Sequence, residues 1–169
     1  AGFDAAMAEQ KSASRDAWSG SGDTASEGVW FKVRDKIGAT NFLGYAGTED
    51  KGTLKAIVAS GEIADEAGPG DCQLVFDRTP FYAESGGQAG DHGEIHFASG
   101  ARFIVRDVQK RAGDLHVHVG ELTDGSIKTG DEAELIANAA RRQRIRANHS
   151  ATHLLHAALR NVLGPHVTQ

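Results

Sequence analysis

The chain has 169 residues, of which 40% are hydrophobic and 24% charged, as in an ordinary soluble protein. This length allows one good hydrophobic core and parts of neighbouring ones. The formal net charge of −5 argues against a protein that coats polyanions over its whole surface, and no apolar run approaches the ~20 residues that span a bilayer.

Residues 1–18 are predicted to form an amphipathic helix, because Phe3, Met7 and Trp18 fall on one stripe. The Gly/Ser-rich residues 19–29 are predicted to be a flexible linker, which would make the helix the end of a preceding domain. The N-terminus has neither the pattern of a signal peptide nor an initiator Met, so we expect the chain to be a piece of a longer protein.

Residues 30–137 are predicted to form a β domain, because short alternating segments follow one another between turn residues. The segments are VWFKV, KGTLKAIVAS, DCQLVFDR, GDHGEIHFAS, ARFIVRDVQKR, DLHVHVGEL and, after the turn KTGD, the strand EAELIA. Seven or so strands at this spacing indicate a closed barrel or a sandwich. The expected fold class is therefore mainly β with flanking helices.

Residues 138–169 are predicted to begin with a long helix that ends at Gly164 and Pro165. This region has five arginines and no acidic residue; the arginines are Arg141, Arg142, Arg144, Arg146 and Arg160. Such a run indicates either a solvated helix face or a face that meets phosphates.

His149 and His153 stand four residues apart on this helix, so both imidazoles project from one face and can reach one Zn²⁺. The metalloprotease pattern is excluded, because it needs Glu after the first His and Ser150 stands there. A packing or surface role is the alternative, and His156 fits a ligand, a supporting or a surface role.

A working zinc site needs three or four protein ligands, and none of the other candidates completes the pair. Cys72 is the single cysteine, which excludes an intrachain disulfide and indicates a reducing compartment, here the cytoplasm. No second cysteine or histidine stands at ligand spacing from it. His116 and His118 alternate with valines and are expected to face solvent, while His92 and His96 lie on or beside strands. The sequence thus predicts half of a metal site.

The segment RTPFYAESGGQAGDHGEI, residues 78–95, is predicted to be a glycine-rich corner whose backbone can approach a ligand closely. It matches neither the phosphate-loop nor the dinucleotide pattern, and a tight barrel hairpin would also explain its glycines. Phe81, Tyr82 and Glu84 beside Gln88 on the same bend favour a binding loop.

TPFYAESGGQAGDHGEI followed some fifty residues later by RANHSATHLLHAALRNVLG resembles alanyl-tRNA synthetase, and the opening GFDAAMAEQK resembles the helix that precedes this region in that family. The resemblance covers essentially the whole chain, from the end of the tRNA-recognition region through a translation-protein-type β-barrel to the start of the editing domain.

The resemblance implies that His149 and His153 are two zinc ligands of the editing site, which hydrolyses Ser and Gly wrongly attached to alanine tRNA. The other two ligands would come from a Cys-x3-His motif beyond Gln169. Gln88 and Thr152 would line the editing pocket, and Arg141, Arg142, Arg144 and Arg146 would contact tRNA phosphates.

The same resemblance implies that the parent attaches alanine to its tRNA with ATP and magnesium, in an aminoacylation domain outside this chain. No complete catalytic site is expected in this piece, so it should be inactive alone, with alanine tRNA and the rest of the synthetase chain as partners and no membrane. The alternatives are a free-standing editing hydrolase and a non-catalytic RNA-binding barrel.

Overall fold

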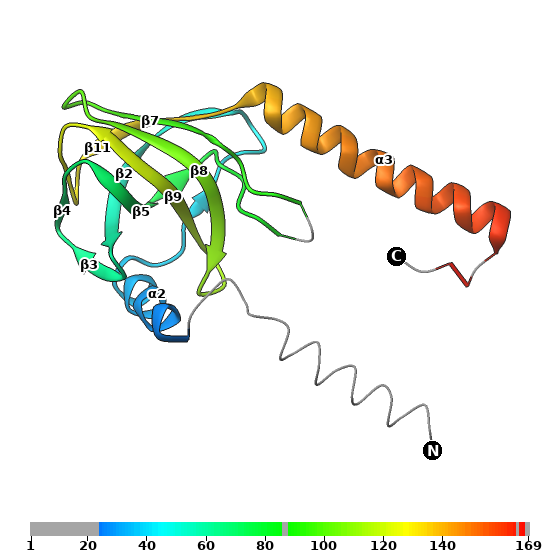
Figure 1. The fold of residues 1–169 in the computed structure, drawn as a ribbon, viewed down its shortest axis with the longest axis horizontal. Helices are drawn as coiled ribbons and strands as arrows, with labels where there is room; N and C mark the ends of the chain where they lie inside the picture. Colours follow the sequence, from blue (N-terminus) through cyan, green and yellow to red (C-terminus); the bar gives the residue numbers. More distant parts are fainter. Residues whose placement is uncertain (1–23, 86–87, 165, 168–169) are drawn as a thin grey trace, which may run out of the picture.

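A computed structural model describes residues 24–85, 88–164 and 166–167 of the chain, and it contains a β-barrel with one helix against its side and one long helix leading away from it (Figure 1). The expectation of a mainly β fold with flanking helices is confirmed. The predicted helix over residues 1–18 and the first part of the predicted linker lie outside the described residues.

Six strands form the closed barrel, in the order β11-β7-β8-β9-β5-β2, and β11 pairs with β2 to complete the ring. Their bounds are β2 Glu49–Ala59, β5 Gly70–Phe76, β7 Gly93–Phe97, β8 Arg102–Arg111, β9 Leu115–Asp124 and β11 Glu132–Ala137. All pairings within this ring are antiparallel. The β domain is therefore a barrel and not a sandwich, and its closure leaves no unpaired sheet edge in the ring.

The remaining strands are short and lie beside the barrel. β1 Asn41–Phe42 pairs in parallel with β6 Arg78–Thr79, and β4 Glu66–Ala67 pairs with β10 Ile127–Lys128. β3 Glu62–Ala64 extends the sheet from β2.

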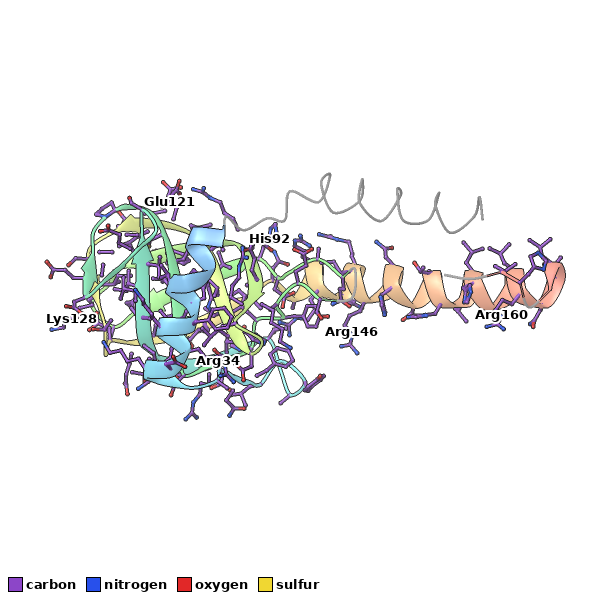
Figure 2. All side chains as sticks on the ribbon, turned by 90° about the horizontal axis from the view of Figure 1, so that it is seen from below. Arg34, His92, Glu121, Lys128, Arg146 and Arg160 are labelled. Atoms are coloured by element: carbon purple, nitrogen blue, oxygen red, sulfur yellow. The ribbon has the colours of Figure 1, made fainter. Side chains whose placement is uncertain are left out.

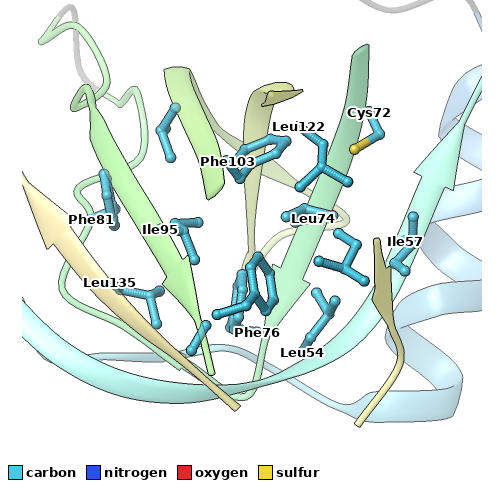
Figure 3. Close-up of a cluster of buried hydrophobic side chains, with 14 of the residues drawn as sticks. Leu54, Ile57, Cys72, Leu74, Phe76, Phe81, Ile95, Phe103, Leu122 and Leu135 are labelled. Atoms are coloured by element: carbon cyan, nitrogen blue, oxygen red, sulfur yellow. The ribbon is translucent and has the colours of Figure 1, made fainter. Parts of the chain in front are cut away.

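The inside of the barrel is filled by large apolar side chains that alternate along the strands (Figure 3). Leu54, Phe76, Phe103, Leu122 and Leu135 have no exposed surface. Cys72 belongs to the same cluster, and burial raises the pKa of its thiol to about 11, which makes it a packing residue and not a thiolate ligand.

Helix α2, Thr24–Ile37, lies on the outside of the barrel, where the sequence predicts a linker and then the strand VWFKV. Its buried Trp30 and Val33 pack with residues of β2, β5 and β9, among them Val58 and Val117. Arg34 donates two hydrogen bonds to Asp114 at the turn between β8 and β9, and the helix ends at Gly38, whose positive φ of 76° suits a helix C-terminus.

Helix α3, Ala139–Leu163, confirms the predicted C-terminal helix. Asn138 caps its first turn by accepting a hydrogen bond from the Arg141 backbone, and Gly164 ends it. The first turn touches the barrel, whereas the rest leads outward into solvent (Figure 1). Neither described helix is both long and apolar enough to cross a bilayer.

Candidate functional site

A buried arginine joins helix α3 to the barrel. All five N–H donors of Arg142 are used: Nε and Nη2 donate to Asp91, Nη1 to the carbonyls of Gly44 and Gly47, and Nη2 also to the carbonyl of Pro80 at 2.6 Å. The residue is 7% exposed and Asp91 is 2% exposed. Arg142 therefore ties the first turn of α3 to two loops of the barrel.

This geometry does not fit the predicted phosphate contact of Arg142, because its guanidinium has no donor left and is almost completely buried. Arg141, one residue earlier, directs Nη2 to Nε2 of His92 at 3.0 Å. Burial lowers the pKa of His92 and the charge of Arg141 lowers it further, so His92 accepts this hydrogen bond as a neutral ring. Arg144 and Arg146 are exposed.

The glycine-rich corner is fixed to the barrel by close backbone approach. A Cβ on Gly90 would lie 2.5 Å from the Val108 carbonyl, and one on Gly93 would lie 2.1 Å from the Ile136 carbonyl. Asp91, between these glycines, accepts a hydrogen bond from the Tyr82 backbone at 2.7 Å and donates its own N–H back to Tyr82. Gly90 and Gly93 thus allow the corner to pack on β8 and β11, while Gly86 and Gly87 lie outside the described residues.

The prediction that His116 and His118 face solvent is wrong. His118 is fully buried and His116 is 8% exposed, because their face of β9 packs on aromatic rings, while α2 covers the opposite face. Nδ1 of His118 donates to the Leu74 carbonyl at 3.1 Å, which leaves Nε2 to accept from the Thr79 hydroxyl at 2.8 Å. Burial lowers the pKa of His118 to about 3 and lowers that of His116 as well, so both rings are neutral.

These two histidines hold the start of the glycine-rich corner. The Thr79 hydroxyl accepts the Phe81 backbone N–H at 3.1 Å, and Nδ1 of His116 donates to the Phe81 carbonyl at 3.1 Å. Phe81, predicted with Tyr82 to belong to a binding loop, is itself fully buried in the barrel. Only Tyr82 of that pair reaches the surface pocket described next.

A pocket of about 210 Å³ lies where the corner meets α3. Its lining residues are Phe42, Gly44, Tyr45, Tyr82, Gln88, Arg142 and Arg146. Phe42 stands edge-on to both tyrosines, with ring centroids 5.0 Å from Tyr45 and 6.2 Å from Tyr82. We call this the aromatic pocket.

One stripe of α3 carries cationic and imidazole side chains outward from the aromatic pocket. Arg142, Arg146, His149, His153, His156 and Arg160 follow at intervals of four, three, four, three and four residues, which places them on one side of the helix. Arg146 and Arg160 mark this side in Figure 2. We call these six residues the polar stripe.

His149 and His153 meet in the middle of the polar stripe. Their Nε2 atoms are 3.0 Å apart, and the rings stand at 82° to each other with both side chains exposed. Two imidazole nitrogens that converge in this way fit two positions of a zinc site. In the part of the chain that the structure describes, no group of three or more His, Cys, Asp or Glu residues gathers around a possible ion.

The other predicted pocket residues do not come together. Gln88 lines the aromatic pocket, whereas Thr152 lies farther out on α3, where its hydroxyl donates to the Asn148 carbonyl at 3.0 Å.

His156 has a buried Nε2 with no hydrogen-bond partner among the described residues. The leucines and valine opposite the polar stripe, including Leu155 at 61% and Val162 at 81% exposed, are also uncovered.

Sequence reasoning missed Tyr45 and Asp91. Tyr45 sits beside Gly44 in a loop with no periodic pattern, and nothing local indicated that it lies beside Gln88. For Asp91 there was a signal, because an acidic residue inside a glycine-rich turn upstream of an arginine-rich helix suggests an ion pair.

Comparison with known proteins places these features in a family. The profile described as tRNA synthetases class II (A) matches residues 1–141. The alanine–tRNA ligases of Hyphomonas neptunium, Parvibaculum lavamentivorans and Rhizorhabdus wittichii are 62%, 53% and 55% identical to the chain. Each alignment covers 99% of the chain and 19% of the relative, so the chain spans about a fifth of the length of these curated relatives.

Proposed function

The chain belongs to the class II (A) tRNA synthetases, and from this premise we propose that it supplies the β-barrel and half of the editing zinc site of an alanine–tRNA ligase. The parent protein would join alanine to its tRNA with ATP and magnesium in a domain outside this chain. The barrel and α3 would serve the hydrolytic removal of Ser and Gly from alanine tRNA.

The observation that carries this proposal is the convergence of His149 and His153 on an exposed helix face. Neutral imidazoles are zinc ligands, and the two Nε2 atoms already point to one place, so the donor set fits half of a tetrahedral site. Zinc bound there would order the site and position the ester or a water. We infer that the remaining ligands come from another part of the full-length protein.

The reaction is ester hydrolysis. Water adds to the ester carbonyl, the bond between that carbonyl carbon and the ribose oxygen breaks, and free amino acid and tRNA with a free hydroxyl are released. Thr152, one residue before His153, would offer its hydroxyl to the misattached side chain, and Gln88 would line the approach from the barrel. Arg141, Arg144 and Arg146 would contact phosphates of the acceptor end without reading bases.

The need for such a step is energetic. Serine differs from alanine by one hydroxyl and glycine lacks one methyl group, and a pocket separates such neighbours by only ~1–3 kcal/mol. A second, hydrolytic selection removes the products that the first binding step admits.

The test uses the full-length protein with His149→Ala and His153→Ala, separately and together. We expect loss of deacylation of Ser-tRNA and Gly-tRNA with aminoacylation nearly unchanged, because the imidazoles serve only the hydrolytic site. Zinc content measured by elemental analysis should fall in the same variants.

Asn161→Ala, on the exposed part of the same helix and off the polar stripe, is the matched control and should keep both activities. If the histidine variants deacylate at the wild-type rate while RNA binding remains, a non-catalytic RNA-binding role would replace this proposal.

A further inference from the structure

We propose that the aromatic pocket binds the unpaired base at the 3′ end of the tRNA by stacking, and so orients the terminal ribose ester toward His149 and His153. The inference rests on the proposed editing function and adds to it a subsite for the base, in which Tyr45 is the stacking ring.

The exposure of Tyr45 is the first observation. Tyr45 is 94% exposed, although burial of such a ring would be favourable, and its ring makes a T-shaped contact with Phe42. Aromatic rings on binding surfaces stack with bases of any sequence, because every base has a π-face. The pocket volume of about 210 Å³ is below the ~300–1,000 Å³ of sites for larger ligands, so it has room for one base or a group of similar size.

The polar groups of the pocket suit a nucleotide. Arg146 is exposed and makes no ion pair with any described residue, so its guanidinium remains available for a phosphate. The side-chain amide of Gln88 makes no hydrogen bond to a described residue and offers both donors and an acceptor to a base edge. Arg142, by contrast, is fully engaged and forms a fixed wall.

Charge favours an anionic ligand such as RNA over a basic or apolar protein segment. The region from residue 138 to 169 has five arginines and no acidic residue, and the polar stripe places cations on both sides of the histidine pair. A phosphodiester leading into the pocket would pass the exposed guanidinium of Arg146.

The spacing along α3 relates the aromatic pocket to the histidine pair. His149 and His153 lie three and seven residues beyond Arg146 on the same stripe, which corresponds to ~4.5 and ~10.5 Å along the helix axis. One nucleoside spans this interval, with its base in the pocket and its ester at the imidazoles.

The experiment measures deacylation of Ser-tRNA by the full-length protein carrying Tyr45→Ala, Tyr45→Leu or Tyr45→Phe. We expect KM to rise about tenfold in the Ala and Leu variants with kcat changed less than about twofold, because a lost stacking partner weakens binding and leaves the imidazoles in place. Tyr45→Phe keeps the ring and should retain most of the affinity. Phe31→Ala removes another exposed ring, on α2 and outside the pocket lining, and should leave KM unchanged.

A second substrate separates stacking from a structural effect. It is Ser-tRNA whose terminal nucleotide lacks its base and keeps its ribose ester. Wild type and Tyr45→Ala should deacylate this substrate with the same kcat/KM, since the group that Tyr45 contacts is absent.

An equal loss on both substrates, or an unchanged KM in Tyr45→Ala, would overturn the inference while leaving the editing proposal intact. Absence of deacylation by the wild-type protein would instead refute the editing proposal itself.

Discussion

At the residue scale, Arg142 shows that neighbouring arginines of one helix have different structural roles. Arg142 is buried with Asp91, while Arg144 and Arg146 are exposed. Burying a guanidinium is tolerated only where its charge is paired and its donors are bonded, and here both conditions hold.

We predict that Arg142→Met destabilises the chain by about 3–5 kcal/mol, because Asp91 would remain buried with a single hydrogen bond from Tyr82. The free energy of unfolding from urea titration measures the loss. Arg144→Met, two residues away and exposed, is the control and should change it by less than ~0.5 kcal/mol.

The double variant Arg142→Met, Asp91→Asn tests the cause. Removing the unpaired carboxylate charge should recover part of the lost stability. The loss of unfolding free energy in the double variant should therefore be smaller than the sum of the losses in the two single variants. A full additive loss would show that the pair is not energetically coupled.

The buried His118 gives the fold a dependence on pH. Its pKa is about 3 in the folded state, because burial disfavours the charged ring, against an ordinary value of 6.5 when unfolded. Between these values the unfolded chain binds a proton that the folded chain does not, so stability is full above pH ~6.5 and falls as the pH decreases toward 3.

We predict that the stability difference between wild type and His118→Gln shrinks by up to about 1.4 kcal/mol per pH unit between about pH 6 and pH 5. Urea titrations at several pH values measure it. His96→Gln is the control, because His96 is partly exposed beside Glu94. Parallel pH curves for wild type and His118→Gln would mean that the ring takes up a proton as readily in the folded protein as in the unfolded chain.

At the element scale, the barrel strands and α3 were predictable because each carries its own signal. In strands such as β9, Leu115–Asp124, bulky apolar residues recur at every second position. Helix α3 has a polar N-cap and a glycine at its C-terminus. α2 was not predictable from VWFKV, since Trp30 and Val33 mark a helix stripe only over a longer window. Five residues fit both periods, and packing on β2, β5 and β9 decides between them.

The candidate site was predictable only where a local sequence pattern indicates it. The His149 and His153 pair follows from local spacing, and the structure brings their Nε2 atoms together. The aromatic pocket combines a loop before β2, the glycine-rich corner and the first turns of α3, so no single segment indicates it. The burial of His116 and His118 likewise depends on residues far away in the sequence, because Phe42, Phe76 and Phe81 cover their face of β9.

At the scale of the whole molecule, α3 leads away from the barrel with two different faces uncovered. The polar stripe carries the histidine pair, and the opposite face exposes Leu155, Leu159 and Val162. A face of this kind is stabilised by packing against other elements. We interpret the barrel as the fixed support of α3 and the uncovered faces as positions for other parts of the full-length protein.

We predict that the 169-residue chain alone deacylates neither Ser-tRNA nor Gly-tRNA, even with added zinc. Two imidazoles supply only half of the ligands that a zinc site requires, and the described residues bring no third group to them. Release of radiolabelled serine measures the reaction, and the full-length protein under the same conditions is the positive control. Zinc-dependent turnover by the chain alone, abolished by His153→Ala, would contradict the half-site interpretation, because it would require a complete metal centre within these residues.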